Sequence, residues 1–233
     1  MILFDEPNIT PVHQCPYLFE DRARLACFAA SELSETEIGM LLSSGWRKFG
    51  YQYFRPLCIG CRECVPIRVL VRDFRPSKSQ RKVIKKNALT EVKFGPLQYS
   101  ERVFEIYREH SGFRFGEKSD RDHFRRSLCA SSCPSGMSSY YVDGDLQGVG
   151  FLDRSHNGLS SVYFIYTEEV KQLSLGTYSV IREIEYAREL GLDYYYLGYL
   201  VEGCGRMAYK GRFFPHERYD WLKQKWERVG GDF

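Results

Sequence analysis

The chain has 233 residues and a net charge of +3, with 43% hydrophobic and 27% charged residues. These values are typical of a globular protein large enough to bury a core, and they exclude a low-complexity chain. No apolar run approaches the roughly 18 residues of a membrane span, and the first segment, MILFDEPNITPVHQ, lacks the features of a signal peptide. We therefore expect a cytoplasmic protein with reduced thiols and no membrane partner.

Short helices and strands are predicted in the first part of the chain. Ser34 and Glu37 have the spacing of a capping box ahead of an apolar segment, which predicts a helix that ends at Gly45. Alternating side chains then predict strands over residues 51–57 and 66–74.

A cysteine-rich loop connects these two strands, with Cys58, Cys61 and Cys64 three residues apart. Zinc and iron–sulfur sites normally use four ligands, and Cys15, which precedes a proline, is the natural fourth thiolate. The alternative is that these thiols are free and pack a turn. The spacing therefore indicates a candidate metal site at Cys15, Cys58, Cys61 and Cys64, with the presence and kind of metal left open.

Positive charge is concentrated around this loop. Residues 47–86 hold twelve basic residues against two acidic ones, and residues 77–89 predict a basic helix. A solvated face is the usual explanation of a charge run, but like charges on neighbouring turns repel, and a polyphosphate partner would relieve that repulsion. We expect this partner to be a folded RNA. The candidate RNA-binding residues are Arg68, Arg72, Lys78, Lys82, Lys85 and Lys86.

A second unit is predicted to begin near residue 96. Residues 97–112 predict an amphipathic helix, and residues 137–167 predict a series of strands joined by glycine-containing turns. A helix with an apolar stripe follows over residues 174–191, and a buried strand follows over residues 192–199. This order of elements indicates an α+β fold with a mixed sheet of the acyl-transfer type.

Candidate functional groups lie at the start of the last helix and in a later loop. Ser174 and Gly176 open the helix, where unpaired backbone N–H groups suit a phosphate or a developing oxyanion, although an ordinary N-cap is the alternative. Tyr209, Lys210 and Arg212 follow a glycine-containing loop. The two cations there either hold an acidic ligand or simply lie on the surface.

A family resemblance is carried by six motifs that occur in this order: CPYL, SGWRKFGYQYFRPLCIGCRECVPIRV, SQRKV, GLSSVYFIY, SLGTYSVIREIEYA and YLGYLVEGCGRMAYKGRF. Over residues 13–217 the chain resembles the bacterial aspartate/glutamate leucyltransferases, which are related to the arginyl-tRNA–protein transferases of the N-degron pathway. Each motif alone is weak, but the set is highly specific. The chain departs from the family at Thr167, Glu168 and Glu169, where an Asp-Pro pair is usual.

The resemblance implies an activity and its partners. Such an enzyme takes leucine from leucyl-tRNA and joins it to the α-amine of a protein that begins with Asp or Glu, which marks that protein for degradation. The alternatives are an arginyl-tRNA–protein transferase and a non-catalytic RNA-binding module that contains a metal. We expect a monomer, and the chemistry itself requires no cofactor.

The resemblance also implies a domain plan and a set of site residues. A cysteine-containing basic domain, residues 1–95, is expected to pack on a GNAT-like acyltransferase domain, residues 96–233. The helix entry KQLSLGT lacks the pyrophosphate loop of an acetyl-CoA enzyme, which disfavours that activity. Asp153 is the first candidate for assisting proton transfer and Tyr166 the second, although Asp153 also fits an ordinary hairpin position. Because an acidic N-terminal residue needs a cation, Arg47, Arg81, Lys210 and Arg212 are candidate substrate-binding residues. Tyr163 and Tyr209 complete the predicted substrate-binding set.

Overall fold

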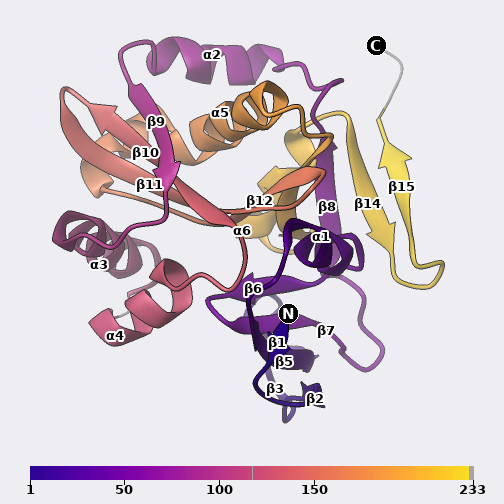
Figure 1. The fold of residues 1–233 in the computed structure, drawn as a ribbon. Coiled ribbons are helices and arrows are strands. Elements are labelled where there is room, and N and C mark those ends of the chain that lie inside the picture. Colours follow the sequence, from indigo (N-terminus) through magenta and orange to yellow (C-terminus); the bar gives the residue numbers. More distant parts are fainter. Residues whose placement is uncertain (117, 231–233) are drawn as a thin grey trace.

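The structure is a computed structural model that describes residues 1–116 and 118–230, and a smaller and a larger sheet dominate it (Figure 1). The path of the smaller sheet runs through β1 (Ile2–Leu3), β5 (Leu25–Ser31), β7 (Gln52–Pro56) and β6 (Arg47–Phe49), and β2 (Asn8–Ile9) also pairs with β5. A separate pair joins β3 (His13–Gln14) to β4 (Arg22–Ala23). The helix α1 (Glu35–Ser43) begins with the capping box expected at Ser34 and Glu37.

The larger sheet has eight strands and confirms the expected mixed α+β architecture. In order across the sheet, the strands are β15 (Lys225–Val229), β14 (His216–Asp220), β8 (Val65–Leu70), β13 (Tyr194–Leu200), β12 (Gly158–Tyr166), β11 (Asp145–Arg154), β10 (Ser135–Val142) and β9 (Glu91–Pro96). Only β12 and β13 run parallel among the paired strands of the described chain. A helix connects them, as a parallel crossover requires.

Helices cover both faces of the larger sheet (Figure 1). On one face lie α2 (Lys78–Lys86) and α5 (Leu175–Glu189), and on the other lie α3 (Glu101–Phe115) and α4 (Arg121–Phe124), which a π-helical turn (Arg125–Cys129) extends. A 3₁₀ turn (Glu168–Leu173) precedes α5, and α6 (Gly205–Ala208) and a second 3₁₀ turn (Tyr209–Arg212) follow β13. No helix in residues 1–116 or 118–230 is long and apolar enough to span a bilayer.

The apolar stripe predicted for α5 forms the centre of the core on its face of the sheet. Its buried residues are Val180, Ile181, Ile184 and Ala187. They pack with Leu152 of β11 and Leu159 of β12. Burial of one such aliphatic side chain contributes roughly 1.5–3 kcal/mol, so this stripe fixes α5 firmly on the sheet.

The basic segment contributes to the larger sheet rather than to the smaller one. β8 pairs with β13 and with β14, and β9 pairs with β10. Between them, α2 packs against α5. The boundary between the two sheets therefore does not fall at residue 96. Residues 65–96 add the strands β8 and β9 to the larger sheet, which we expected from the second unit alone, and they also supply α2 on its face.

The parallel pair β12 and β13 is joined over only a short distance. Their register runs from Gly158 beside Tyr194 to Ser160 beside Tyr196, and the two strands are not paired beyond that point. We call the region between residues 161–166 of β12 and residues 197–200 of β13 the fork. Backbone groups that face the fork must find partners other than a neighbouring strand.

Candidate functional site

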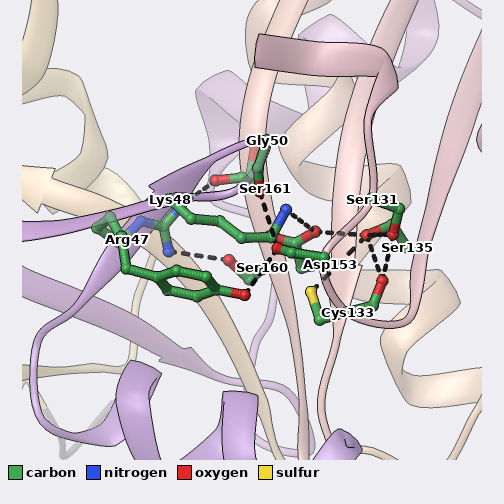
Figure 2. A network of polar contacts seen from close by, with 11 residues as sticks. Arg47, Lys48, Gly50, Ser131, Cys133, Ser135, Asp153, Ser160 and Ser161 are labelled. Carbon is green, nitrogen blue, oxygen red and sulfur yellow. Dashed lines mark hydrogen bonds and ion pairs between the residues drawn. The ribbon is translucent and has the colours of Figure 1, made fainter. Parts of the chain in front are cut away.

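Strand β6 brings two adjacent cations, Arg47 and Lys48, to different strands of the larger sheet. The β6 strand contacts β12. Figure 2 shows Lys48 reaching Asp153 on β11, whereas Arg47 reaches Ser160 and Ser161 on β12. The two side chains therefore have different partners although they are neighbours in sequence.

Lys48 forms a buried ion pair. Its Nζ lies 3.0 Å from Oδ1 of Asp153, and the two side chains are only 5% and 3% exposed. The Ser135 hydroxyl donates to the same oxygen at 2.8 Å. Burial by itself lowers the pKa of Lys48, but the Asp153 carboxylate outweighs it and holds the pKa above its ordinary value. The predicted catalytic residue Asp153 is thus committed to joining β6 to the large sheet.

Arg47 closes the narrow end of the fork. Its Nη1 donates to Ser160 Oγ at 2.9 Å, and its Nη2 donates to the carbonyl of Ser161 in a short hydrogen bond. From the other side, Lys210 Nζ donates to the carbonyl of Tyr199 at 3.0 Å. Two cations therefore satisfy carbonyl groups that the separated strands leave without a strand partner.

Gly198 allows both cations to approach β13. Its φ of +82° lies in the left-handed region that favours glycine, and an added Cβ would lie 3.5 Å from Lys210 Nζ and 3.6 Å from Arg47 Nε. Arg47 and Lys210 are thus close neighbours across the fork. A side chain at residue 198 would contact both cations and would be strained by the positive φ.

The two cations at the fork have no carboxylate partner. In the described part of the chain, neither Arg47 nor Lys210 forms an ion pair. Burial, followed by the charge of Arg47, lowers the pKa of Lys210 to about 7. Burial also lowers the pKa of Arg47. Because both side chains remain partly accessible, an anionic ligand can reach them and relieve their repulsion.

Aromatic side chains line the region around these cations. Tyr163 of β12 contacts the ring of Phe49 edge-on, with centroids 6.5 Å apart. Burial, with the charge of Glu183 as the next cause, raises the pKa of Tyr209 to about 12, and Tyr166 acts on it too. The structure therefore brings Arg47, Lys210 and the predicted tyrosines together at the fork.

Two other predicted substrate-binding cations lie outside the fork. Arg81 is exposed, and its Nη1 donates to the carbonyl of Pro76 at 2.7 Å. The Arg212 side chain is also exposed, while its backbone carbonyl accepts a hydrogen bond from Gln80. Neither guanidinium joins the pair formed by Arg47 and Lys210.

The cysteine-rich loop borders the fork. Burial, together with the thiols of Cys15, Cys58 and Cys61 in that order, raises the pKa of Cys64 to about 12. All eight cysteines are free, and no three Cys, His, Asp or Glu side chains of the described residues are placed to hold a metal ion. Four thiolates suit zinc or an iron–sulfur cluster in number and kind. In this structure the four thiols are too far apart to form a coordination shell.

The start of α5 differs from the simple cap expected at Ser174. This residue adopts a left-handed conformation, with φ of 57°, and its side chain makes no capping hydrogen bond. Its carbonyl accepts hydrogen bonds from the backbone N–H groups of Thr177 and Tyr178. The expectation that the Ser174 side chain caps the helix is wrong, because the preceding 3₁₀ turn sets the backbone at this position. Gly176 lies in the first turn, with open space around its α-carbon.

The basic helix α2 presents most of the predicted RNA-binding residues to solvent. Lys78, Lys82, Lys85 and Lys86 are exposed, and within the described chain none of them joins an ion pair. Arg72 is exposed too, but it pairs with Asp193 at 3.1 Å. A positive face of this kind suits a phosphate backbone.

Arg68 has a different environment. Its guanidinium carbon lies 3.7 Å from the ring centroid of Tyr194 and 4.3 Å from that of Trp226. Its Nη2 lies 2.6 Å from a carboxylate oxygen of Glu217. This buried guanidinium is fully engaged, so we leave it out of the proposed RNA surface.

Two surface hollows lie away from the fork. One, of about 310 Å³, lies over Phe94, Gly136 and Tyr186, and its charged groups, Glu35 and Arg154, pair with each other at 3.2 Å. The other, of about 400 Å³, is lined by residues that include Phe4, Tyr51 and Cys133. We place the functional site at the fork because unpaired cations gather there.

Sequence reasoning missed three residues that the structure places at or beside the fork, namely Lys48, Glu183 and Tyr195. Glu183 carried a usable signal, because a carboxylate stands inside the apolar stripe of a helix. The partners of Lys48 and Tyr195 come from distant segments, and no local pattern marks them.

The larger sheet holds a forked parallel pair joined by α5, with two close cations at the fork. The sequence comparisons then give the family. Residues 13–82 and 101–220 match the family descriptions "Arginine-tRNA-protein transferase, N terminus" and "Arginine-tRNA-protein transferase, C terminus". The chain belongs to the arginine-tRNA-protein transferase family, and it is an aminoacyltransferase.

Similar proteins span nearly the whole chain. A relative from Marinobacter nauticus, named aspartate/glutamate leucyltransferase, is 34% identical over 89% of this chain and 90% of its own. A protein with the same name from Chromobacterium violaceum is 35% identical over 88% of this chain and 87% of its own. Another from Pseudoalteromonas atlantica is 31% identical over 95% of this chain and 96% of its own. The family resemblance of the sequence is thereby confirmed.

Solved structures resemble the chain more distantly. The C-terminal domain of a putative lysylphosphatidylglycerol synthetase from Agrobacterium fabrum has a TM-score of 0.48 at 10% identity, covering 60% of this chain and 47% of its own. The structure of FemX has a TM-score of 0.45 at 11% identity, covering 69% and 59%. We base the assignment on the sequence family and on the geometry of the fork.

Proposed function

We propose that the protein transfers leucine from leucyl-tRNA to the α-amine of proteins that begin with Asp or Glu, which marks them for degradation. The observation that carries this proposal is the pair Arg47 and Lys210 at the fork, two close cations without a carboxylate partner in the described chain. An acidic side chain supplies the missing negative charge. The relatives named aspartate/glutamate leucyltransferase support the same substrates.

The acceptor residue binds with its side-chain carboxylate between the two cations. Arg47 uses Nη1 and Nη2 to hold Ser160 and Ser161 of β12. Lys210 uses one of its three donors for the carbonyl of Tyr199 and keeps the others for a ligand. The α-amine of the same residue is then held beside residue 161, on the β12 side of the fork.

The donor tRNA approaches along α2. The start of this helix is tied to the loop that carries Lys210, because Gln80 Nε2 donates to the Arg212 carbonyl at 3.1 Å. Its last residue, Lys86, lies 3.5 Å from the Gln172 carbonyl, just before α5. The exposed lysines of α2 therefore run between both sides of the site, and phosphates bound along them place the aminoacyl end near the fork.

The chemistry needs mainly positioning. An aminoacyl ester is already activated, so the enzyme must hold an unprotonated amine against its carbonyl carbon. The backbone N–H groups that open α5 near Gly176 are the candidates for stabilising the oxyanion. Asp153 contributes indirectly in this proposal, since its pairing with Lys48 fixes β6 and with it Arg47.

The four cysteines beside the fork form a second part of the proposal. Cys15, Cys58, Cys61 and Cys64 would hold a zinc ion or an iron–sulfur cluster, which would draw the loop over residues 58–64 toward Cys15. The support is their spacing in sequence and their mutual effect on the Cys64 thiol. No step of the transfer depends on this group.

The test is a transfer assay with matched donors and acceptors. Purified protein is given radiolabelled leucyl-tRNA or arginyl-tRNA with peptides that differ only in an N-terminal Asp, Glu, Asn or Ala. We expect leucine on the Asp and Glu peptides alone, and none after the tRNA is digested with RNase. Transfer of arginine only would overturn the assignment of the donor, and tRNA binding without any transfer would overturn the activity.

A further inference from the structure

A buried carboxyl group lies beneath the sheet near the fork. Glu183, in the middle of α5, is 1% exposed. An added Cβ on Gly150 of β11 would lie only 2.4 Å from Glu183 Oε1, so this glycine leaves the space that the carboxyl group occupies. The fold therefore makes room for an acid in the core of the acyltransferase sheet.

The partners of Glu183 are all hydroxyl groups. Ser138 Oγ of β10 donates to Glu183 Oε1 at 2.8 Å, and the Tyr195 hydroxyl of β13 donates to Oε2 in a short hydrogen bond. The Tyr140 hydroxyl also acts on the carboxyl group, but its hydrogen bond goes to the carbonyl of Ser179 at 3.5 Å. Among the described residues no cation forms an ion pair with Glu183.

These surroundings let the carboxyl group change its charge near neutral pH. Burial, only partly offset by the hydrogen bonds from Tyr195 and Ser138, raises the pKa of Glu183 to about 7. The titratable groups that face it from packed elements are Tyr140 of β10, Tyr195 of β13 and Tyr209, next to β13. All three tyrosines are held above their ordinary pKa, so they stay neutral when Glu183 ionises.

A line of polar side chains leads from Glu183 to the fork. The Tyr195 hydroxyl donates to Glu183, and the Ser161 side chain acts on the same hydroxyl group. Because the Tyr195 proton points to the carboxylate, the Tyr195 oxygen is the atom left to accept from the Ser161 hydroxyl. The carbonyl of the same serine accepts from Arg47. The line therefore ends beside the cation that we propose as a holder of the acidic acceptor residue.

We propose that Glu183 is the terminal proton acceptor for the attacking α-amine and that Tyr195 and Ser161 carry the proton to it. This inference rests on the proposed function. Glu183 does not touch the substrate; it acts through the two hydroxyl groups, and the Ser161 oxygen is the group that contacts the amine.

The proton transfer balances as follows. An ammonium proton passes to Ser161 Oγ, the serine proton passes to Tyr195, and the tyrosine proton passes to Glu183 Oε2. After the product leaves, Glu183 returns this proton by the reverse path to water at the fork. The freed nitrogen lone pair forms the C–N bond to the ester carbonyl, and the bond from that carbon to the tRNA ribose oxygen breaks. One of the two remaining amine protons neutralises that ribose oxygen, and the other stays on the amide.

The decisive experiment compares three variants at saturating leucyl-tRNA and Asp-initiated peptide. Glu183→Gln and Tyr195→Phe each remove a member of the line, whereas Tyr140→Phe removes a hydroxyl group that bonds the carbonyl of Ser179 and lies outside the line. We expect kcat to fall at least about 100-fold in the first two variants and to stay within about three-fold of wild type in the third. Thermal melting confirms that each variant is folded.

The pH profile separates proton transfer from a merely structural role. Wild-type kcat is expected to rise with pH through about 7, since only the ionised carboxylate accepts a proton. This inflection is absent in Glu183→Gln, while the KM for the peptide changes little. An unchanged inflection, or equal rates for Tyr195→Phe and Tyr140→Phe, would overturn the inference. A wild-type enzyme that transfers nothing to the Asp peptide would instead overturn the proposed function.

Discussion

Arg47 and Lys48 are neighbours on one strand, yet one is an unpaired cation and the other is half of an ion pair. Lys48 lies 3.0 Å from Asp153, and both side chains are almost fully buried. Arg47 bonds neutral oxygens of Ser160 and Ser161, forms no ion pair in the described chain, and faces the like-charged Lys210 across Gly198. A compensated charge holds the fold together, whereas an uncompensated one implies a ligand.

The comparison also explains why Asp153 is a poor candidate for chemistry. Asp153 already pairs with Lys48 and accepts a hydrogen bond from Ser135, so its carboxylate is occupied in joining β6 to the larger sheet. Glu183, which has only hydroxyl partners, changes its charge near neutral pH. Breaking the pair should therefore affect stability, and changing the unpaired groups should affect turnover and substrate binding.

The largest effect is expected from Asp153→Ala. This change leaves Lys48 as an uncompensated buried charge, and loss of one partner of such a pair costs about 3–5 kcal/mol of unfolding free energy. Urea denaturation monitored by circular dichroism measures it. The double change Lys48→Met with Asp153→Leu should recover much of the loss. An Asp153→Ala protein with wild-type stability but no turnover would instead make Asp153 catalytic.

A second effect concerns the pH dependence of stability. The folded pKa of Glu183 is about 7 against an ordinary value of 4.5, so the folded state binds the proton more tightly than the unfolded state. The contribution of Glu183 to the free energy of unfolding is complete below pH 4.5 and is lost as the pH rises through 7. This contribution amounts to at most about 3 kcal/mol. Denaturant midpoints of wild type and Glu183→Gln across this range measure it. The difference between the two proteins should change with pH, and parallel curves would contradict the buried titration.

Substrate binding is expected to respond next, through Lys210→Met. The variant keeps the length of the side chain but loses a charge-assisted hydrogen bond worth roughly 1.5–3 kcal/mol, so KM for an Asp-initiated peptide should rise about 10- to 100-fold. Arg212→Met, a change of an exposed cation outside the fork, is the matched control and should leave KM near wild type. Equal effects of the two changes would show that the fork does not select the acidic residue.

The same lysine predicts a pH dependence of peptide binding. Burial and Arg47 lower the pKa of Lys210 to about 7, so its charge is present below that pH and is lost above it. KM for the Asp peptide should therefore rise with pH above about 7, although a bound carboxylate shifts the inflection upward. Steady-state kinetics over pH 6–9 measure the trend, and Lys210→Met should abolish it. A KM independent of pH in the wild-type enzyme would place the carboxylate elsewhere.

The smallest effect is expected on tRNA binding. Lys82→Ala and Lys85→Ala on α2 should each weaken binding modestly and reduce the dependence of log K on log salt by about one unit. Lys223→Ala is the control, because this lysine pairs with Glu227 on the β14–β15 hairpin. Filter binding at several salt concentrations gives the slopes. A slope that falls equally for the control would contradict a specific surface on α2.

Local patterns predicted the parts of the fold that depend on neighbouring residues. The capping box at Ser34 starts α1 where the sequence indicated, and α2 follows Ser77 within the segment predicted as a basic helix. The β10–β11 turn has positive φ at Asp143 and Gly144, as its residues suggested. Helix α5 ends at Glu189, and Gly191, two residues further on, has a positive φ. In each case the relevant atoms lie within a few residues of one another.

Contacts between distant segments could not be predicted in the same way. Arg68 seemed to belong to the basic surface, but it bonds Glu217, which is 149 residues away in sequence. The β14–β15 hairpin that brings this partner was not expected at all. Arg47 was found only through the family motifs, whereas Lys210 was also marked by its glycine-containing loop, and the unpaired state of both required the structure.

The most direct test of the central claim compares Asp- and Asn-initiated peptides, which differ in charge but hardly in shape. The ratio of their kcat/KM values with leucyl-tRNA is measured for the wild type and for Lys210→Met. Unpaired cations at the fork predict a strong wild-type preference for Asp that falls at least about ten-fold in the variant. A wild-type enzyme that uses both peptides equally, or a variant that keeps the full preference, would contradict the account.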